Sequence, residues 1–224
     1  MNGIDQLVRL LHLASPALPV GAYSYSQGLE AAIESRIVHD AASAGCWIGD
    51  AFQLSVAACE APLLLRMIGA WETNDAAAAS RWNDELLATR ETSELRAETC
   101  QMGYSLRRLL ASLWGDAVAR LERFEEISYP LAFAFACAHW KIEPRAALAA
   151  YLWSWCENQV LAAMKAVPLG QTDGQSQLVA LGERVPGAVE AALARGDDEI
   201  ENFAPGLALA SSRHETQYSR LFRS

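Results

Sequence analysis

The residues from Pro144 to Val167 form a long helical run that is apolar on nearly every side. Pro144 stands where a first helical residue should, because the backbone N–H group that proline lacks would have no partner there. Large apolar side chains line both sides of the run, namely Leu148, Leu152, Trp155 and Leu161 on one side and Trp153, Cys156, Val160 and Met164 on the other. A helix without a broad polar face belongs at the centre of a bundle. The run therefore predicts an all-α fold built around this helix.

The rest of the chain also shows helical periodicity. The clearest amphipathic helix is expected at residues 91–114, where Leu95, Thr99, Met102, Leu106, Leu109 and Leu113 alternate steps of four and three. Further helices are expected at residues 7–14, 41–58, 62–71, 75–87, 172–182 and 187–195, from 207 onward, and after an S-x-x-Q capping box at Ser24 to Gln27. No segment alternates like a strand. We therefore predict a single-domain helical bundle spanning residues 1–224.

Charge and cysteine usage exclude several classes of protein. The chain has 27 acidic and 18 basic residues, a net charge of −9, whereas a protein that binds nucleic acid needs a basic surface. Its five cysteines form no C-x-x-C pair, which favours reduced core thiols over a structural zinc site. No apolar stretch approaches the roughly 18 residues of a membrane span. We expect a cytoplasmic protein without nucleic-acid or membrane partners.

The tail, residues 205–224, ends in twelve residues, Arg213 to Ser224, that hold three arginines, a histidine and two aromatics. On a helix, one apolar and aromatic stripe would contain His214, Tyr218, Leu221 and Phe222, and a polar stripe beside it would contain Arg213, Gln217 and Arg220. Because Glu215 is the only acid here, the local charge is positive and suits an acidic partner. A second reading is equally open: a C-terminal helix that packs on its own domain, with arginines favoured near its end by the helix dipole.

The candidate ligands and nucleophiles do not combine into a known site. None of the four histidines, His12, His39, His139 and His214, has a second His or Cys three or four residues away on the same expected helix. Each is therefore expected to be a core or surface residue. The stretch at 170–175 lacks the lysine and hydroxyl of a phosphate loop. We expect no catalytic residue, no cofactor and no metal ligand within the chain, although a metal shared between subunits would leave no such pattern.

Two polar features near the end of the apolar run each have two readings. Lys165 lies in its last turn, where a cation ordinarily satisfies the terminal carbonyls; the functional reading turns its charge toward an interface. The ordinary reading is favoured. Glu157, Asn158 and Gln159 interrupt the apolar surface and need hydrogen-bond partners if they are buried. They fit structural hydrogen bonding and a polar passage equally well.

Three stretches together resemble the urease accessory protein F family, UreF. The first two are ASPALPVGAYSYSQGLE at residues 14–30 and VPLGQTDGQ at residues 167–175, and the third is the tail from Arg213 to Ser224. They occur in the order typical of the family, and the helices between them fit in length, so the resemblance covers nearly the whole chain. Tyr23 and Ser212 stand where the family often has Phe and Met, and neither difference threatens a role.

The resemblance implies an all-helical, non-catalytic protein that dimerises and binds a second accessory protein, UreD (also called UreH). It then recruits the GTPase UreG, and the assembly delivers nickel to the urease apoprotein. The tail of this family contributes to partner contacts. The residues that we assign to partner binding are Arg213, His214, Glu215, Gln217, Tyr218, Arg220, Leu221, Phe222, Arg223 and Lys165.

A mechanism follows as a hypothesis: partner binding orders the tail, and the ordered tail completes the surface on which the GTPase docks. Burying Tyr218, Leu221 and Phe222 would offset the entropy of ordering. Two alternatives stay open. One is a carrier that binds nickel directly through its histidines, and the other is an all-helical enzyme that uses the polar residues of the central helix.

Overall fold

The computed structural model describes residues 3–224, and every regular element in that part of the chain is helical. The predicted all-α fold is confirmed. The α-helices are α1 (Gly3–Leu13), α2 (Leu29–Glu34), α3 (Ala41–Ala51), α4 (Ala61–Glu72), α5 (Ala76–Ala88), α6 (Ser93–Trp114), α7 (Ala119–Glu122), α8 (Tyr129–His139), α9 (Pro144–Ala166), α10 (Gln171–Gly182), α11 (Val185–Ala194) and α12 (Pro205–His214). Short 3₁₀ segments lie at η1 (Ala22–Ser24), η3 (Gly115–Val118) and η4 (Asp197–Glu199), and a π-helix lies at η2 (Phe52–Glu60).

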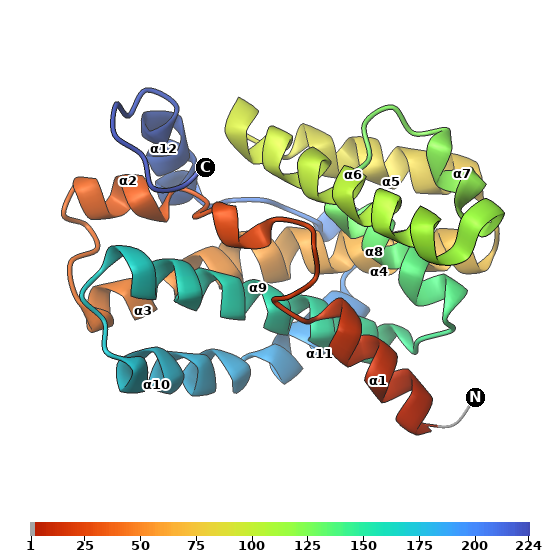
Figure 1. Cartoon of the computed structure of the whole chain (residues 1–224), viewed down its shortest axis with the longest axis horizontal. Helices are drawn as coiled ribbons and strands as arrows, with labels where there is room; N and C mark the ends of the chain where they lie inside the picture. Colours follow the sequence, from red (N-terminus) through yellow and green to blue (C-terminus); the bar gives the residue numbers. More distant parts are fainter. Residues whose placement is uncertain (1–2) are drawn as a thin grey trace.

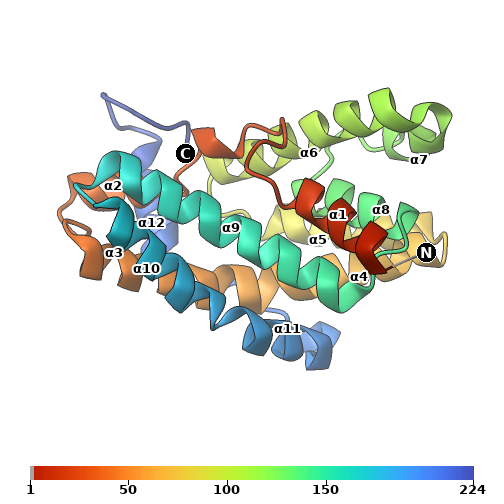
Figure 2. The same cartoon turned by 60° about the horizontal axis from the view of Figure 1, so that its bottom comes forward.

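Helix α9 is the central element that the sequence predicts. It packs against α1, α2, α3 and α4 as well as α10 and α11. Figures 1 and 2 show α9 running along the length of the molecule, with α10 and α11 beside it. Most of its side chains are buried, including Leu148, Leu152 and Val160. The absence of a polar face on this helix is thus explained by neighbours on several sides.

Helices α3 and α4 are joined by the π-helix into one continuous run, Ala41–Glu72. The sequence predicts two separate helices here, at residues 41–58 and 62–71, and this expectation is wrong. Pro62 has no N–H group to donate within a helical turn. The π-helix, whose turns are wider, ends at Glu60, just before this proline. At its end the Ala61 N–H donates to the Val56 carbonyl. By length and composition alone this run could cross a membrane, but 72% of its most apolar window is buried inside the bundle. Its apolarity is that of a core helix.

Helix α6 crosses α8 at Gly103. A Cβ atom at this position would lie 2.1 Å from the Ile127 carbonyl oxygen and 2.6 Å from the Ser128 carbonyl carbon. Only glycine therefore allows the two backbones to approach so closely. The predicted apolar face of α6 is confirmed from Leu95 to Leu106, but Leu113, near its C-terminal end, is exposed.

The apolar loop before α2 packs against the bundle, as its composition predicts, with Leu18, Val20 and Tyr25 buried. The predicted capping box is wrong, because α2 begins only at Leu29 and its N-cap is Gly28. Gln27 cannot fold back to cap a helix, since its side-chain amide bonds to Glu98 and to Trp155. Gly28 has a left-handed φ of 77°, and its Cα lies close to the backbone of α12. The segment between Ser24 and Gly28 is thus fixed by tertiary contacts.

Candidate functional site: the C-terminal segment and the cavity beneath it

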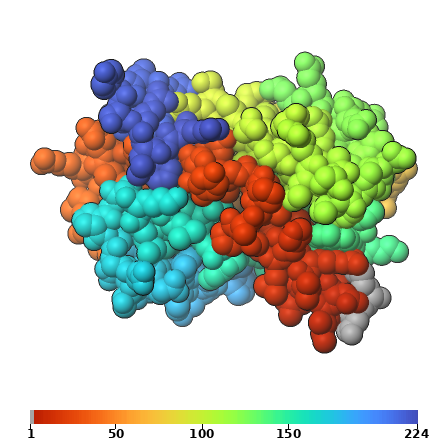
Figure 3. Space-filling view, viewed as in Figure 1, coloured from red at the N-terminus to blue at the C-terminus, as the bar shows by residue number. Residues whose placement is uncertain are grey.

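Helix α12 ends at His214, so the predicted helix through the tail is wrong beyond that residue. Residues 215–224, here called the C-terminal segment, turn back along the surface of the same chain. Figure 3 shows this segment in blue on the same face as the N-terminal loop in red-orange and the end of α9 in cyan. The helix cannot continue because backbone N–H groups farther along the segment are bound to α2 and to the loop before it. In this arrangement the segment is therefore held by contacts within its own chain, and the ordering of the tail by a partner stays a prediction.

His214 is the buried end of α12 and lies between two glutamates. Its Nδ1 is 2.6 Å from Glu94 Oε2 on α6, and its Nε2 is 3.3 Å from Glu30 Oε2 on α2. The imidazole is fully buried, while the two carboxylates are mostly buried. These three side chains, here called the glutamate–histidine clamp, connect three elements that are far apart in the sequence.

The backbone of the C-terminal segment is bound from both sides. Leu221 and Phe222 donate their N–H groups to the Glu30 carboxylate, at 2.6 and 2.8 Å. Farther on, the Arg223 N–H donates to the Ser24 carbonyl, and the Ser26 N–H and hydroxyl both donate to the Ser224 carbonyl. Because donors and acceptors at the buried positions are paired in this way, the last residues follow a defined path.

Glu215 and Arg220 fix the outer turn of the segment. The Glu215 carboxylate accepts hydrogen bonds from the Ser93 N–H and hydroxyl at the start of α6, where the helix dipole also favours a negative charge. The Ser93 hydroxyl is the main cause that lowers the pKa of Glu215. Arg220 donates to Glu94 Oε1 at 2.5 Å and to the Glu215 carbonyl at 2.6 Å. The turn is therefore held by charged hydrogen bonds on both sides.

The residues assigned to partner binding divide into anchors and exposed groups. His214 and Phe222 are buried, whereas Tyr218 is fully exposed, Leu221 is 62% exposed and Arg213 is exposed. The helical stripe that would place all four apolar and aromatic side chains on one face does not exist. Among the other residues, the Gln217 amide donates to the Ser219 carbonyl. Burial raises the pKa of Tyr25, and the nearby Arg223 side chain acts in the opposite direction.

Lys165 joins the same surface. Its Nζ lies 3.4 Å from the Tyr23 carbonyl and within 6 Å of the ring centres of Tyr23 and Phe222 (5.6 and 5.9 Å). The favoured reading, a cation that satisfies the last carbonyls of α9, is therefore not what the structure shows. The lysine instead contacts the N-terminal loop and the C-terminal segment.

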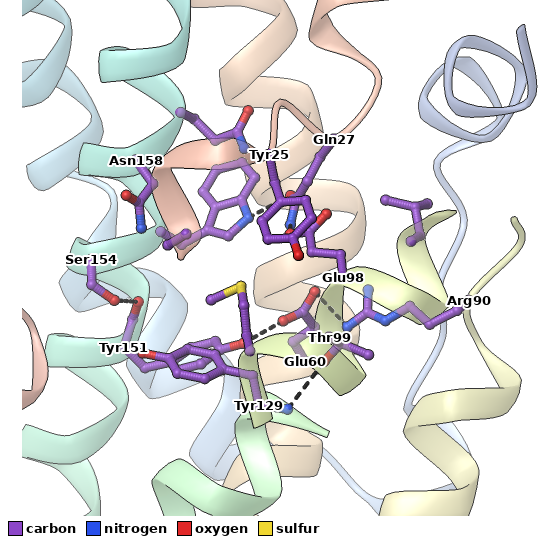
Figure 4. A pocket seen from close by; sticks show the side chains of 15 residues that line it. Tyr25, Gln27, Glu60, Arg90, Glu98, Thr99, Tyr129, Tyr151, Ser154 and Asn158 are labelled. Atoms are coloured by element: carbon purple, nitrogen blue, oxygen red, sulfur yellow. Dashed lines mark hydrogen bonds and ion pairs between the residues drawn. The ribbon is translucent and has the colours of Figure 1, made fainter. Parts of the chain in front are cut away.

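A small polar cavity of about 50 Å³ lies beneath this surface, between α6, α9 and the N-terminal loop. At one end Glu60 pairs with Arg90 at 2.8 Å and accepts a hydrogen bond from the Tyr151 hydroxyl at 2.6 Å (Figure 4). The two charged side chains are only 6% and 9% exposed. Burial and then the Glu60 charge raise the pKa of Tyr151 well above its usual value, so the tyrosine remains a donor. Asn158 and Gln159 also line the cavity, where their amide groups lie near other polar side chains, as buried polar groups need hydrogen-bond partners.

Glu98 links this cavity to the C-terminal segment. Its carboxylate accepts hydrogen bonds of 2.7 Å from the Gln27 amide and from the Ser224 hydroxyl, and Gln27 in turn accepts one from the Trp155 indole. Burial raises the pKa of Glu98 to about 7, although the two hydrogen bonds act in the opposite direction. The position of the segment is thus connected by hydrogen bonds to the centre of α9.

Sequence reasoning missed Glu30, Glu94 and Glu98, which hold the segment. The signal was indirect: a tail with three arginines and one histidine needs acidic groups wherever it is bound, but many glutamates could supply them. The other histidines lie elsewhere, with His139 stacked on Trp114 and His39 at the surface beside Asp40. Within residues 3–224, no three His, Cys, Asp or Glu side chains are placed to hold a metal ion.

Comparison with known sequences identifies the family. The sequence model of the UreF family matches residues 38–182. The urease accessory protein UreF of Azoarcus sp. (strain BH72) is 57% identical over 228 aligned residues, which cover 100% of this chain and 97% of that protein. This chain belongs to the UreF family. Two further relatives support this assignment. The UreF protein of Dechloromonas aromatica (strain RCB) is 52% identical, with 98% of both chains covered. The UreF protein of Methylobacillus flagellatus is 53% identical, with 100% of both chains covered.

The resemblance found in three sequence stretches is therefore confirmed. The matches with these UreF proteins extend over the full chain and so include the N-terminal loop and the C-terminal segment, which lie outside the region that the family model matches. In this UreF-family chain those two regions form one surface together with the end of α9.

Proposed function

We propose that this chain is a non-catalytic, cytoplasmic scaffold for assembly of the urease nickel centre. It binds the accessory protein UreD/UreH and the GTPase UreG, acts as a homodimer on the urease apoprotein, and needs neither nucleic acid nor a membrane. Nickel is the cargo of this assembly. Membership of the UreF family, whose relatives are named urease accessory proteins, supports the accessory role.

The proposed docking site rests on one observation. The buried side chains of His214 and Phe222 anchor the end of the chain, whereas Tyr218 and Leu221 between them are exposed to solvent. Tyrosine and arginine are enriched among the residues that dominate binding energy at interfaces. Contacts within the chain anchor the segment, and they offset part of the entropy that fixing it for a partner would cost. Arg213 is also exposed, and Lys165 lies beside Phe222, the residue next to Leu221; their positive charges suit an acidic partner surface.

The exposed side chains allow a test that leaves the fold intact. We would replace Tyr218 and Leu221 together by alanine and measure binding to UreD/UreH and UreG by pull-down and calorimetry. Truncation after Ser212 is a poorer test, because it would remove His214 and leave Glu30 and Glu94 without their partner. The double variant is expected to weaken binding of at least one partner by about tenfold or more while its circular dichroism stays unchanged.

The matched control replaces Tyr104 and Leu113, which are exposed on α6, by alanine. This control should bind both partners like the wild type. If the Tyr218 and Leu221 variant also binds both partners with wild-type affinity, the docking surface lies elsewhere. Nickel titration of the isolated chain separates the direct-carrier alternative, which requires tight stoichiometric binding in the absence of any partner.

A further inference from the structure

An extended, exposed stretch at residues 199–203 leads from η4 to α12. Its side chains alternate: Glu199, Glu201 and Phe203 are exposed, whereas Ile200 and Asn202 between them are partly buried. The backbone of Ile200 lies in the extended region, with φ −73° and ψ 118°. The Phe203 ring is 70% exposed although it is apolar. This alternation is typical of a strand that has one face on the protein and the other in solvent.

The stretch is held on its inner side and free on its outer side. The Phe203 N–H donates to the Leu54 carbonyl in the π-helix at 3.4 Å, and the Asn202 amide donates to the Thr89 carbonyl at 3.0 Å. The backbone groups of residues 200–202 make no hydrogen bond in the part of the chain that the structure describes. Free N–H and C=O groups on an extended backbone are the groups to which a partner strand adds.

An apolar groove of about 170 Å³ begins where the stretch meets α12. Trp47 and Leu54 line one side of it, and Ala204 and Leu207 line the other. Leu54 is 43% exposed and lies in the π-helix, a conformation that recurs at functional sites. Helix α12 begins here without a side-chain cap, so its first N–H groups are available to a carbonyl group of a ligand. The groove can therefore take an apolar side chain together with the backbone that carries it.

The surface around the stretch and the groove is acidic. Four exposed carboxylates here have no ion-pair partner among residues 3–224, namely Asp50, Asp198, Glu199 and Glu201. Asp197 beside them is already paired with Arg66. Unpaired carboxylates next to apolar groups suit lysine or arginine side chains of a partner. They would repel an anionic membrane, and a second copy of this surface would bring like charges together.

We propose that residues 199–203 and the adjoining groove, here called the acidic edge, bind an extended, basic segment of a partner protein. The segment adds as a short strand along the stretch, with an apolar side chain in the groove beside Phe203 and cationic side chains opposite Glu199 and Glu201. The acidic edge lies at the start of α12, whereas the C-terminal segment follows its end. It is thus a second partner surface, and it does not rest on the proposed function.

The test uses the full chain and a peptide in which lysine alternates with leucine, with binding measured by calorimetry and the contact residues located by NMR amide shifts. The largest shifts should fall in residues 199–207, and the affinity should fall as salt is added. Phe203→Ser, and separately Asp50→Lys with Glu201→Lys, should each weaken binding about tenfold or more. Neither of these two carboxylates makes a hydrogen bond in the described chain, so thermal unfolding should stay unchanged.

Matched controls separate the acidic edge from general attraction to an acidic protein. Glu122→Lys with Glu125→Lys makes the same charge change at exposed sites, and Val179→Ser removes a side chain that is 65% exposed on α10. Both should bind the peptide like the wild type. If the two charge variants weaken binding equally, the attraction is non-specific and the proposal is overturned.

Two further measurements test other occupants. Ultracentrifugation of Phe203→Ser should give the wild-type oligomeric state; a change would make the groove a contact between copies and overturn the proposal. The Tyr218 and Leu221 alanine variant should keep peptide binding. Loss of binding in that variant would place the peptide on the C-terminal segment instead, whereas the proposed function is judged separately by binding of UreD/UreH and UreG.

Discussion

Glu98→Gln should make the protein more stable at pH 8 and leave its stability nearly unchanged at pH 5. The wild-type carboxyl is fully buried, and its pKa is raised from the ordinary 4.5 to about 7, chiefly by burial. Glutamine keeps the shape of the side chain. Its oxygen can accept from the Gln27 amide, and its nitrogen can donate to the Ser224 hydroxyl, which rotates to accept.

The magnitude follows from the pKa difference between the folded and unfolded states. Because each pKa unit corresponds to about 1.4 kcal/mol, the raised pKa of Glu98 amounts to about 3 kcal/mol as an upper value. Between pH 4.5 and 7 the folded state binds more protons at this site than the unfolded state does. The contribution of Glu98 to stability is therefore most favourable below pH 4.5 and is lost as the pH rises through 7. The neutral glutamine has no such loss.

The assay is urea unfolding of both proteins from pH 5 to pH 8, with the difference in unfolding free energy taken at each pH. Other groups titrate in both proteins, so only this difference reports Glu98. At pH 8 the variant should be more stable by up to about 3 kcal/mol, or about 6 to 12 °C in Tm for a chain of this size. Glu122→Gln, at an exposed site, should show no pH-dependent difference. If the difference for Glu98→Gln is the same at pH 5 and pH 8, the reasoning is refuted.

Two further predictions concern the core. Arg90→Met leaves the buried Glu60 carboxylate without its cation, so the free energy of unfolding should fall by about 3 to 5 kcal/mol in urea titrations, whereas Arg108→Met at the surface should change it little. Gly103→Ala forces a Cβ into the backbone at the start of α8 and should cost about 1 to 3 kcal/mol or more, seen as a lower Tm. Gly69→Ala, in an open position on α4, should instead raise stability by up to about 1 kcal/mol; an equal effect of both glycine variants would contradict the close crossing.

The helical framework was readable from sequence because it depends on local periodicity. The run that begins at Pro144 forms α9, and the amphipathic run that ends at Trp114 forms α6, each close to its expected bounds. Asp75 caps α5 as an acidic N-cap residue should. In each case the residues that set the structure lie within a few turns of one another, so the pattern alone contains the information.

The candidate site was only partly readable. The composition of the tail predicted a surface that binds acidic groups. The structure does place acidic groups beside it, but they are Glu30 and Glu94 of the same chain. The exposed Tyr218 and the buried Phe222 lie four residues apart and would share one face of a helix. Their separation depends on where the backbone turns away from the helix, and distant hydrogen-bond acceptors determine that point.

The sequence by itself determined the helical class, the central helix and the family, because these follow from side-chain pattern along the chain. The tertiary structure decided how the chain ends. Helix α12 ends at His214 because the buried ring is held between α2 and α6 and because Glu30 takes the backbone N–H groups of the segment beyond it. Contacts between residues nearly two hundred positions apart leave no periodic trace in the sequence, and here they override the helical spacing of the last residues.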